Sequence, residues 1–159
     1  MRKSTVFLCA ATAVLASCSS PSPWPWESAS AGPANPRKVL VSVVNGQIRV
    51  DQETAVLRAS NGAVLWDLAP SAWGYKFADG GIRFEFPAPS MPSDCKSTPN
   101  PVEFFDLPQC VPAANGRQFV CPRRSNHLPG ACFKYTVKLQ PQAGSPSVPD
   151  KDPWIMSEE

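Results

Sequence analysis

The sequence has little of what most catalytic and metal sites require. Its 159 residues contain one histidine, His127, and no HExxH, P-loop, GxGxxG or Gly-x-Ser-x-Gly motif. These absences exclude the zinc proteases, nucleotide-binding proteins and serine hydrolases that such motifs identify. A catalytic histidine also needs a nucleophile beside it. A lone loop histidine is therefore most often a solvated residue.

The chain also lacks a large excess of charge of either sign. Lysine and arginine together number 15, and aspartate and glutamate number 13, for a net charge of +2. Strongly basic domains or long basic runs are typical of proteins that bind nucleic acid or anionic lipid. We therefore expect no nucleic-acid partner.

No apolar run outside the N-terminal segment suggests a membrane helix, and the run within it is short. Residues 6–16 form an eleven-residue apolar stretch behind Arg2 and Lys3, whereas a spanning helix needs about 20 residues. A basic start, a short apolar stretch and small residues at its end are typical of a cleaved export signal.

The signal ends in Leu15-Ala16-Ser17-Cys18, which resembles the lipobox of bacterial lipoproteins. The resemblance implies removal of residues 1–17 and acylation of Cys18, whose two or more acyl chains would anchor the protein stably. Ser19 occupies the place where an Asp favours inner-membrane retention in Gram-negative members. The resemblance thus implies a lipid-anchored envelope protein, in the outer membrane if the source is Gram-negative. The alternative is an ordinary secretory signal in which Cys18 is incidental.

Proline accounts for 19 of the 159 residues, more than twice the usual share of about 5%. The prolines are concentrated in the two flanking regions and in one internal stretch. Residues 18–36 are rich in proline and serine and predict a semi-extended tether. Within it, Trp24 and Trp26 are either a second membrane anchor or side chains that lie against the domain or in solvent. Residues 37–140 predict the folded domain. Residues 141–159 predict an extended tail whose apolar end docks on the domain or frays.

From residue 37 the apolar residues follow the period of strands. About eight short segments are separated by turn signals such as Asn45-Gly46, and no clear amphipathic helix lies between them. The segments are 38–44, 47–50, 54–59, 64–68, 73–77, 82–86, 117–121 and 131–140. This pattern predicts an all-β fold, an antiparallel β-sandwich or small barrel. The proline-rich residues 87–112 predict a long loop with one short element near 102–107.

The expected core consists of the apolar residues on one face of these strands. They are Val41, Val43, Ile48, Val50, Val56, Val64, Trp66, Phe77, Phe84, Phe86, Phe119, Phe133, Tyr135 and Val137.

Apart from Cys9 in the signal and the lipidation candidate Cys18, four cysteines remain: Cys95, Cys110, Cys121 and Cys132. An even number in an exported chain predicts two disulfides. Three pairings are possible, and closeness in sequence favours Cys95 with Cys110 and Cys121 with Cys132. Alternation places Cys132 on the polar side of its strand, so its disulfide is expected to attach a loop to that face of the sheet.

Residues 119–137 resemble the closing hairpin of cupredoxins, in which a strand ends in a cysteine, here Cys121, and the last strand returns after a ligand loop. The resemblance implies a cupredoxin-like sandwich. A blue-copper centre needs two histidines, a cysteine thiolate and usually a methionine. The hairpin has only His127 and no methionine. We therefore expect no metal or other cofactor.

Five basic residues lie on or beside this expected hairpin, and they form either a binding patch or a solvated face. They are Arg117, Arg123, Arg124, Lys134 and Lys138. The carboxylate pairs nearest to a glycosidase arrangement, Asp51 with Glu53 and Glu103 with Asp106, have no feature that singles out an acid and a base.

The sequence thus predicts a membrane-tethered envelope lipoprotein with a non-catalytic β-sandwich that binds a protein or glycan partner. Two alternatives stay open: an envelope enzyme or enzyme inhibitor, and a degenerate cupredoxin-type redox or metal carrier.

Overall fold

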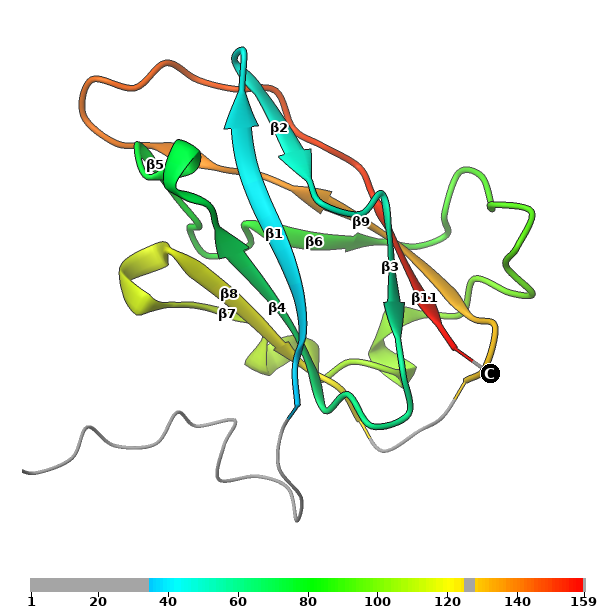
Figure 1. Cartoon of the computed structure of the whole chain (residues 1–159). Coiled ribbons are helices and arrows are strands. Elements are labelled where there is room, and N and C mark those ends of the chain that lie inside the picture. The colour runs from blue at the N-terminus through cyan, green and yellow to red at the C-terminus, as the bar shows by residue number, and fades with distance from the viewer. Residues whose placement is uncertain (1–34, 125–127, 159) are drawn as a thin grey trace, which may run out of the picture.

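The computed structural model describes residues 35–124 and 128–158 (Figure 1). These residues form eleven strands and four 3-10 helices, with no α-helix among them, and none of their helices could span a membrane. The all-β expectation is confirmed. Cys18, most of the tether and His127 lie outside the described residues.

The first sheet has five strands in the order β2-β1-β4-β8-β7. Their bounds are Arg37–Val44 for β1, Gln47–Val50 for β2, Ala63–Leu68 for β4, Val111–Ala113 for β7 and Gln118–Pro122 for β8. The predicted turn at Asn45-Gly46 joins β1 to β2, and both residues have positive φ, at 52° and 71°. Such angles are those of the tight turns that suit twisted hairpins.

The second sheet has four strands in the order β3-β11-β9-β6. Their bounds are Thr54–Leu57 for β3, Ile82–Glu85 for β6, Cys132–Val137 for β9 and Trp154–Ser157 for β11. A third, small sheet pairs β5 (Tyr75–Lys76) with β10 (Gln140–Pro141). The 3-10 helices are η1 (Pro70–Ala72), η2 (Pro101–Glu103), η3 (Leu107–Gln109) and η4 (Ala114–Gly116).

The expectation of purely antiparallel sheets is wrong. β1 pairs with β4 in parallel, and β11 pairs with β3 in parallel. Parallel neighbours need a long crossover rather than a tight turn. Turn signals in the sequence predict hairpins only, so they could not indicate these two pairs.

The expected hairpin at 119–137 is also wrong. β8 pairs with β4 and β7 of the first sheet, whereas β9 pairs with β11 and β6 of the second. The chain between them therefore crosses from one sheet to the other. The cupredoxin-like resemblance rested on this hairpin, and the strand pairing does not support it.

The two large sheets face each other across an aromatic core. Trp66 on β4 lies 5.3 Å from Tyr135 and 6.5 Å from Phe84 of the second sheet, centroid to centroid, and 6.2 Å from Phe119 of its own sheet. These edge-on geometries are the favourable ones for aromatic rings. Most of the expected core is buried, namely Val41, Ile48, Val64, Trp66, Phe77, Phe119, Phe133, Tyr135 and Val137, and Val43, Val50 and Phe84 pack against it.

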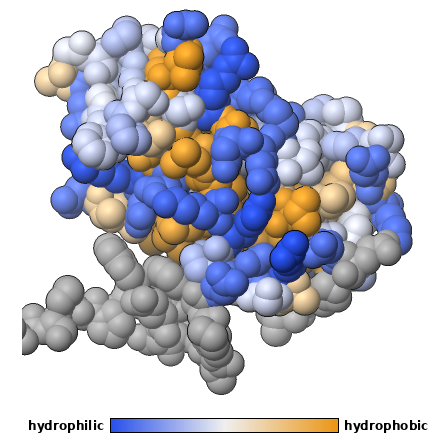
Figure 2. All heavy atoms as spheres, viewed as in Figure 1, coloured by the Kyte–Doolittle hydropathy of each residue, from blue (hydrophilic) through white to orange (hydrophobic). Residues whose placement is uncertain are grey.

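Two of the expected core residues are placed wrongly. Val56 is only half-buried, because β3 turns Ala55 and Leu57 inward instead. Ala55, Val56 and Leu57 are consecutive apolar residues, so the period could not reveal which face is inside. Phe86 is 53% exposed, since it lies beyond the end of β6. Leu40 and Val44 of β1 are also exposed. On the face of the molecule that Figure 2 shows, apolar residues lie among polar ones.

The long proline-rich loop adds to the core. Phe104 and Phe105 are fully buried. Phe105 stacks on Phe84 with 4.5 Å between ring centroids, and Phe104 lies 4.8 Å from Phe133. The one short element expected near 102–107 proves to be two 3-10 turns, η2 and η3, on either side of this aromatic pair.

Of the two outcomes expected for the apolar end of residues 141–159, the structure shows docking on the domain. The last residues of this segment form β11, which lies between β3 and β9 in the second sheet (Figure 1), and Ile155 is fully buried. The folded domain therefore extends to this strand. A strand of four residues takes its stability from neighbours far away in sequence, which the local pattern does not show.

Candidate functional site

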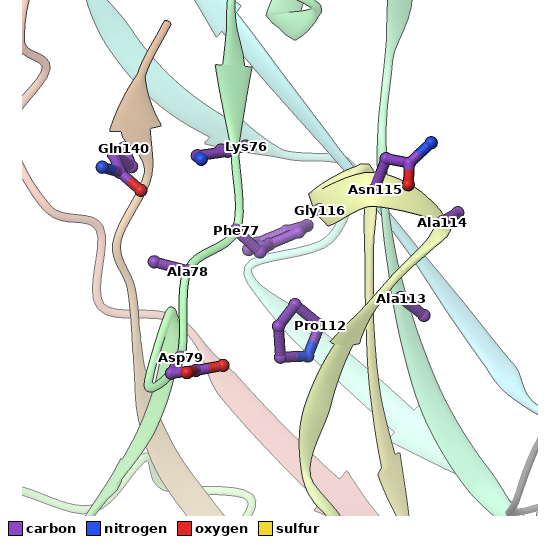
Figure 3. A pocket seen from close by; sticks show the side chains of 10 residues that line it. All are labelled: Lys76, Phe77, Ala78, Asp79, Pro112, Ala113, Ala114, Asn115, Gly116 and Gln140. Carbon is purple, nitrogen blue, oxygen red and sulfur yellow. The ribbon is translucent and has the colours of Figure 1, made fainter.

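A solvent-open depression of about 730 Å³ lies where three separate segments meet (Figure 3). One segment runs from the end of β5 to Asp79, the second covers the end of β7 and η4, and the third is β10. The side chains of Lys76 and Gln140 lie on one side, and Ala114 and Asn115 lie on the other. We call this hollow the larger depression; it is lined by Lys76, Phe77, Ala78, Asp79, Pro112, Ala113, Ala114, Asn115, Gly116 and Gln140.

The turn on one wall of the larger depression has an unusual backbone. Ala114, Asn115 and Gly116 have φ of 50°, 59° and 80°, in the left-handed region that costs a residue with a Cβ roughly 1–2 kcal/mol. The Phe77 N–H donates to the Gly116 carbonyl at 2.7 Å. A Cβ at position 116 would lie 2.8 Å from the Phe77 carbonyl oxygen. Strained backbone of this kind clusters at binding and catalytic sites.

A smaller depression of about 340 Å³ adjoins the larger one. The two share Ala78, Asp79 and Gln140, which border both depressions and which we call the ridge. The smaller depression is lined by Ala78, Asp79, Gly80, Gly81, Arg83, Lys138, Leu139, Gln140 and Pro141.

The charged groups of the two depressions are mostly cations. Lys76 lines the larger one, Arg83 and Lys138 line the smaller one, and Asp79 is the single acid among the lining residues. Arg83 donates to the Gly80 carbonyl at 3.2 Å. Within the part of the chain that the structure describes, the ammonium groups of Lys76 and Lys138 have no hydrogen bond or ion pair. They are therefore available to a ligand.

An exposed tryptophan lies close in sequence to the larger depression. Trp73 is 51% exposed, and the guanidinium carbon of Arg117 lies 4.7 Å from its ring centroid. Arg117 directly follows Gly116 of the strained turn. The Gln142 side chain donates to the Trp73 carbonyl at 3.2 Å, which fixes this stretch of backbone beside β10.

The five basic residues predicted as a patch are dispersed. Arg117 and Arg123 flank opposite ends of β8 in the first sheet, whereas Lys134 lies on β9 of the second sheet. Lys134 donates to the Asp152 carbonyl at 2.6 Å and lies over the Trp154 ring. Of the five, Lys138 lines a depression and Arg117 is next to one.

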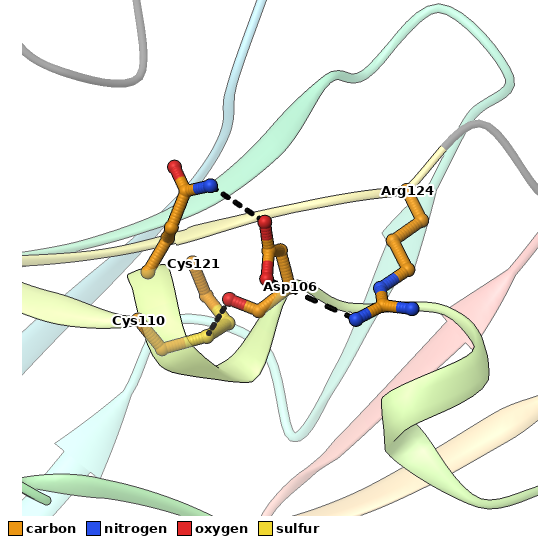
Figure 4. Close-up of a disulfide and its surroundings, with 5 residues drawn as sticks. Asp106, Cys110, Cys121 and Arg124 are labelled. Atoms are coloured by element: carbon orange, nitrogen blue, oxygen red, sulfur yellow. Dashed lines mark hydrogen bonds and ion pairs between the residues drawn. A yellow bond between two sulfur atoms is a disulfide. The ribbon is translucent and has the colours of Figure 1, made fainter. Parts of the chain in front are cut away.

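Arg123 and Arg124 support loops. The Arg123 guanidinium donates to the carbonyls of Arg58 and Ala59 at 2.9 and 3.0 Å and lies over the Phe104 ring, and burial lowers its pKa. Arg124 lies 3.9 Å from Asp106 (Figure 4). These contacts give both residues a structural role.

All four cysteines are in disulfides, as predicted, but the favoured pairing is wrong. The bonds join Cys95 to Cys132 and Cys110 to Cys121. β7 pairs with β8, which brings Cys110 beside Cys121 (Figure 4). The Cys132 N–H donates to the Ser97 carbonyl at 2.8 Å, so the long loop runs beside the start of β9. Closeness in space here follows sheet pairing rather than closeness in sequence.

The carboxylates considered for catalysis have structural partners. Asp51 accepts the Leu40 N–H at 3.0 Å, Glu53 pairs with Lys151 at 2.9 Å, and Asp106 accepts from Gln109 at 2.6 Å. Among the described residues, no three His, Cys, Asp or Glu side chains form a group that could hold a metal.

Tyr135 is the clearest perturbed titratable group. Burial raises the pKa of its hydroxyl above the ordinary value, with smaller contributions from the Trp66 indole, which lowers it, and from Asp51 and Glu53, which raise it. Its hydroxyl is buried in the core and lines neither depression, so it is not placed to transfer protons to a ligand.

Sequence reasoning missed the larger depression. Its lining comes from residues 76–79, 112–116 and 140, which no sequence period brings together. The one local signal is Asn115-Gly116, a pair typical of turns with positive φ. Comparison with protein-family models finds no match to the chain, and comparison with curated proteins finds none either. We therefore infer the function from the geometry of the two depressions.

Proposed function

We propose that the protein is a membrane-tethered envelope lipoprotein whose β-domain is non-catalytic and binds a partner at the two depressions. The lipobox-like Leu15-Ala16-Ser17-Cys18 and the proline-rich residues 18–36 support the tether. The two disulfides fit an oxidising compartment outside the cytoplasm.

The observation that carries the binding role is that Lys76 and Lys138, whose ammonium groups have no partner among the described residues, line adjoining depressions. Each is an open site for an anionic group, and opposite charge both attracts and orients a partner. The turn at Ala114 and Asn115 also supports a binding role, because both residues have positive φ. The conformational energy of such residues is tolerated only where the surrounding structure enforces it, and such residues cluster at binding sites.

The side chains that line the depressions favour binding over catalysis. They include no histidine, cysteine, serine, threonine or tyrosine, and the single carboxylate is Asp79. Covalent catalysis by a hydroxyl or thiol needs that group beside a base, and glycoside hydrolysis needs two carboxylic groups. Neither set occurs among the lining residues.

A photo-crosslinking amino acid tests the binding role in intact cells. Placed at Asn115 on the wall of the larger depression, it should form an adduct with an envelope component. The same group at Arg49, an exposed residue of the edge strand β2, serves as the control. No adduct at Asn115, or equal adducts at both positions, would contradict the proposal.

The tether has its own test. The membrane-extracted wild-type protein should have the mass of residues 18–159 plus acyl groups, and the Cys18→Ser variant should lose acylation and membrane retention. A wild-type protein that is soluble and carries no lipid would overturn the anchor and leave the binding role standing.

A further inference from the structure

We infer that the ligand of the two depressions is an acidic polysaccharide, a chain of sugar rings that carry carboxylates. This inference rests on the proposed binding function and names the chemical class of the partner. It follows from three kinds of side chain that the fold brings to one region: unpaired cations, exposed amides and an exposed tryptophan.

The cations are arranged for a ligand with repeated negative charge. Lys76 lies in the larger depression, and Lys138 and Arg83 lie in the smaller one across the Ala78–Asp79 ridge. A single small anion would occupy one depression only. A polymer with a carboxylate on successive rings can place one charge in each depression at the same time, and such linked contacts raise the apparent affinity.

The amides supply contacts for hydroxyl groups. Asn115 and Gln140 are both exposed and lie on opposite sides of the larger depression (Figure 3). Each carboxamide carries two N–H donors and an acceptor oxygen, so it can bind hydroxyls in either direction. Sugar rings present many hydroxyls, whereas an acidic peptide presents few beyond its carboxylates.

Trp73 supplies an apolar surface. Its ring is half exposed and held beside Arg117, next to the strained turn. Tryptophan combines a large rigid apolar surface with a polar N–H, which suits a sugar ring with its C–H face and polar edge. The guanidinium of Arg117 adds a further positive charge beside the larger depression.

The same depressions suit an acidic peptide less well. Peptide partners are usually held by strand addition, by an apolar groove for a helix, or by buried pockets for anchor side chains. The lining here offers Phe77, Pro112, Leu139 and small residues in open hollows. An acidic peptide is therefore the competing outcome of the test.

Asp79 provides a test of whether the ligand is an anion. It is the one acid among the lining residues and lies on the ridge between the cations. It repels a polyanion that crosses the ridge. Asp79→Asn should therefore strengthen binding of a carboxylated chain and leave a neutral chain unaffected.

The test measures binding of the full mature protein in detergent, by titration calorimetry, to three acidic polysaccharides: polygalacturonate, alginate and hyaluronan. Fully methyl-esterified polygalacturonate is the matched neutral probe, and poly-glutamate is the peptide probe. At least one acidic polysaccharide should bind about tenfold or more tightly than either control probe, with an affinity that falls as salt rises.

Variants assign the binding to the depressions. Lys76→Ala and Lys138→Ala should each weaken it about tenfold, as expected for loss of one charge-assisted contact, and Arg49→Ala should leave it unchanged. Circular dichroism confirms that each variant is folded. Trp73→Ala should weaken binding to the polysaccharide.

Three results would overturn the inference: no binding to any of the three acidic polysaccharides, equal or tighter binding of poly-glutamate, or binding that Lys76→Ala and Lys138→Ala leave unchanged. A crosslinked protein at Asn115 together with no polysaccharide binding would reject the polysaccharide and retain the binding function. Absence of both would reject the two proposals together.

Discussion

Two irregular segments of the domain, residues 87–110 and 142–153, have similar shares of proline and opposite roles. The first carries the fully buried Phe104 and Phe105 and one cysteine of each disulfide. The second is mostly exposed, and Val148 is its partly buried apolar contact with the core. Proline thus indicates where strands are absent, and large apolar side chains and cysteines decide whether such a segment belongs to the core.

The largest expected loss of stability follows from a substitution in the buried aromatic pair of the first segment, Phe104 and Phe105. Phe105→Ala should lower the free energy of unfolding by about 3–5 kcal/mol, as for other buried phenylalanines. Val148→Ala in the second segment should lower it by about 1 kcal/mol or less, because a partly buried valine loses little contact. Urea denaturation of the two variants measures the difference. Equal losses would show that the two segments contribute alike.

The disulfides give the next effect, and they differ in the loop that each one closes. Cys95–Cys132 spans 37 residues and Cys110–Cys121 spans 11. By chain entropy, replacing both cysteines of a bond with alanine should cost about 4 kcal/mol for the first and about 3 kcal/mol for the second. Thermal unfolding of the two double variants should follow this order. The reverse order would mean that strand pairing beside the bond outweighs loop length.

Hydrogen exchange compares the two segments without substitution. The N–H groups of Phe104, Phe105, Gln109 and Cys110 donate to backbone carbonyls, whereas between residues 146 and 150 no such bond is made by the described backbone. Peptides covering 146–150 should exchange within seconds, and those covering 103–110 should be protected far longer. Protection of both segments would place the second one in the folded core.

The smallest effect is expected at the end of the second segment. Lys151 pairs with Glu53 at 2.9 Å, with 31% and 62% of the two side chains exposed. Exposed ion pairs contribute little, so Lys151→Ala should change the free energy of unfolding by about 0.5 kcal/mol or less. A loss comparable to that of Phe105→Ala would show that this segment is held by more than its surface contacts.

The sequence was sufficient for the β character, the turn at Asn45-Gly46 and most of the inward-facing residues of β1, β4 and β9, because alternation and turn chemistry are local. It was insufficient for the parallel pairs and for β11, since their partners are separated by long stretches of chain. The disulfide pairing failed for the same reason. The five basic residues do not form the expected patch, because β8 and β9 belong to different sheets.

The candidate site was harder still to predict. Lys138 was singled out as a basic residue, but Lys76, Asn115 and Gln140 were not, because each is unremarkable within its own segment. Their importance arises only where β5, η4 and β10 meet. A site assembled from the ends of short elements leaves no spacing pattern in the chain.

The position of β11 has a consequence for the order of events during synthesis. Among the described strands, β3 has β11 as its only neighbour, and the two are separated by almost the whole described domain in sequence. The second sheet cannot close before β11 has been synthesised. A domain cut before Trp154 would lack the strand that joins β3 to β9 at the centre of that sheet.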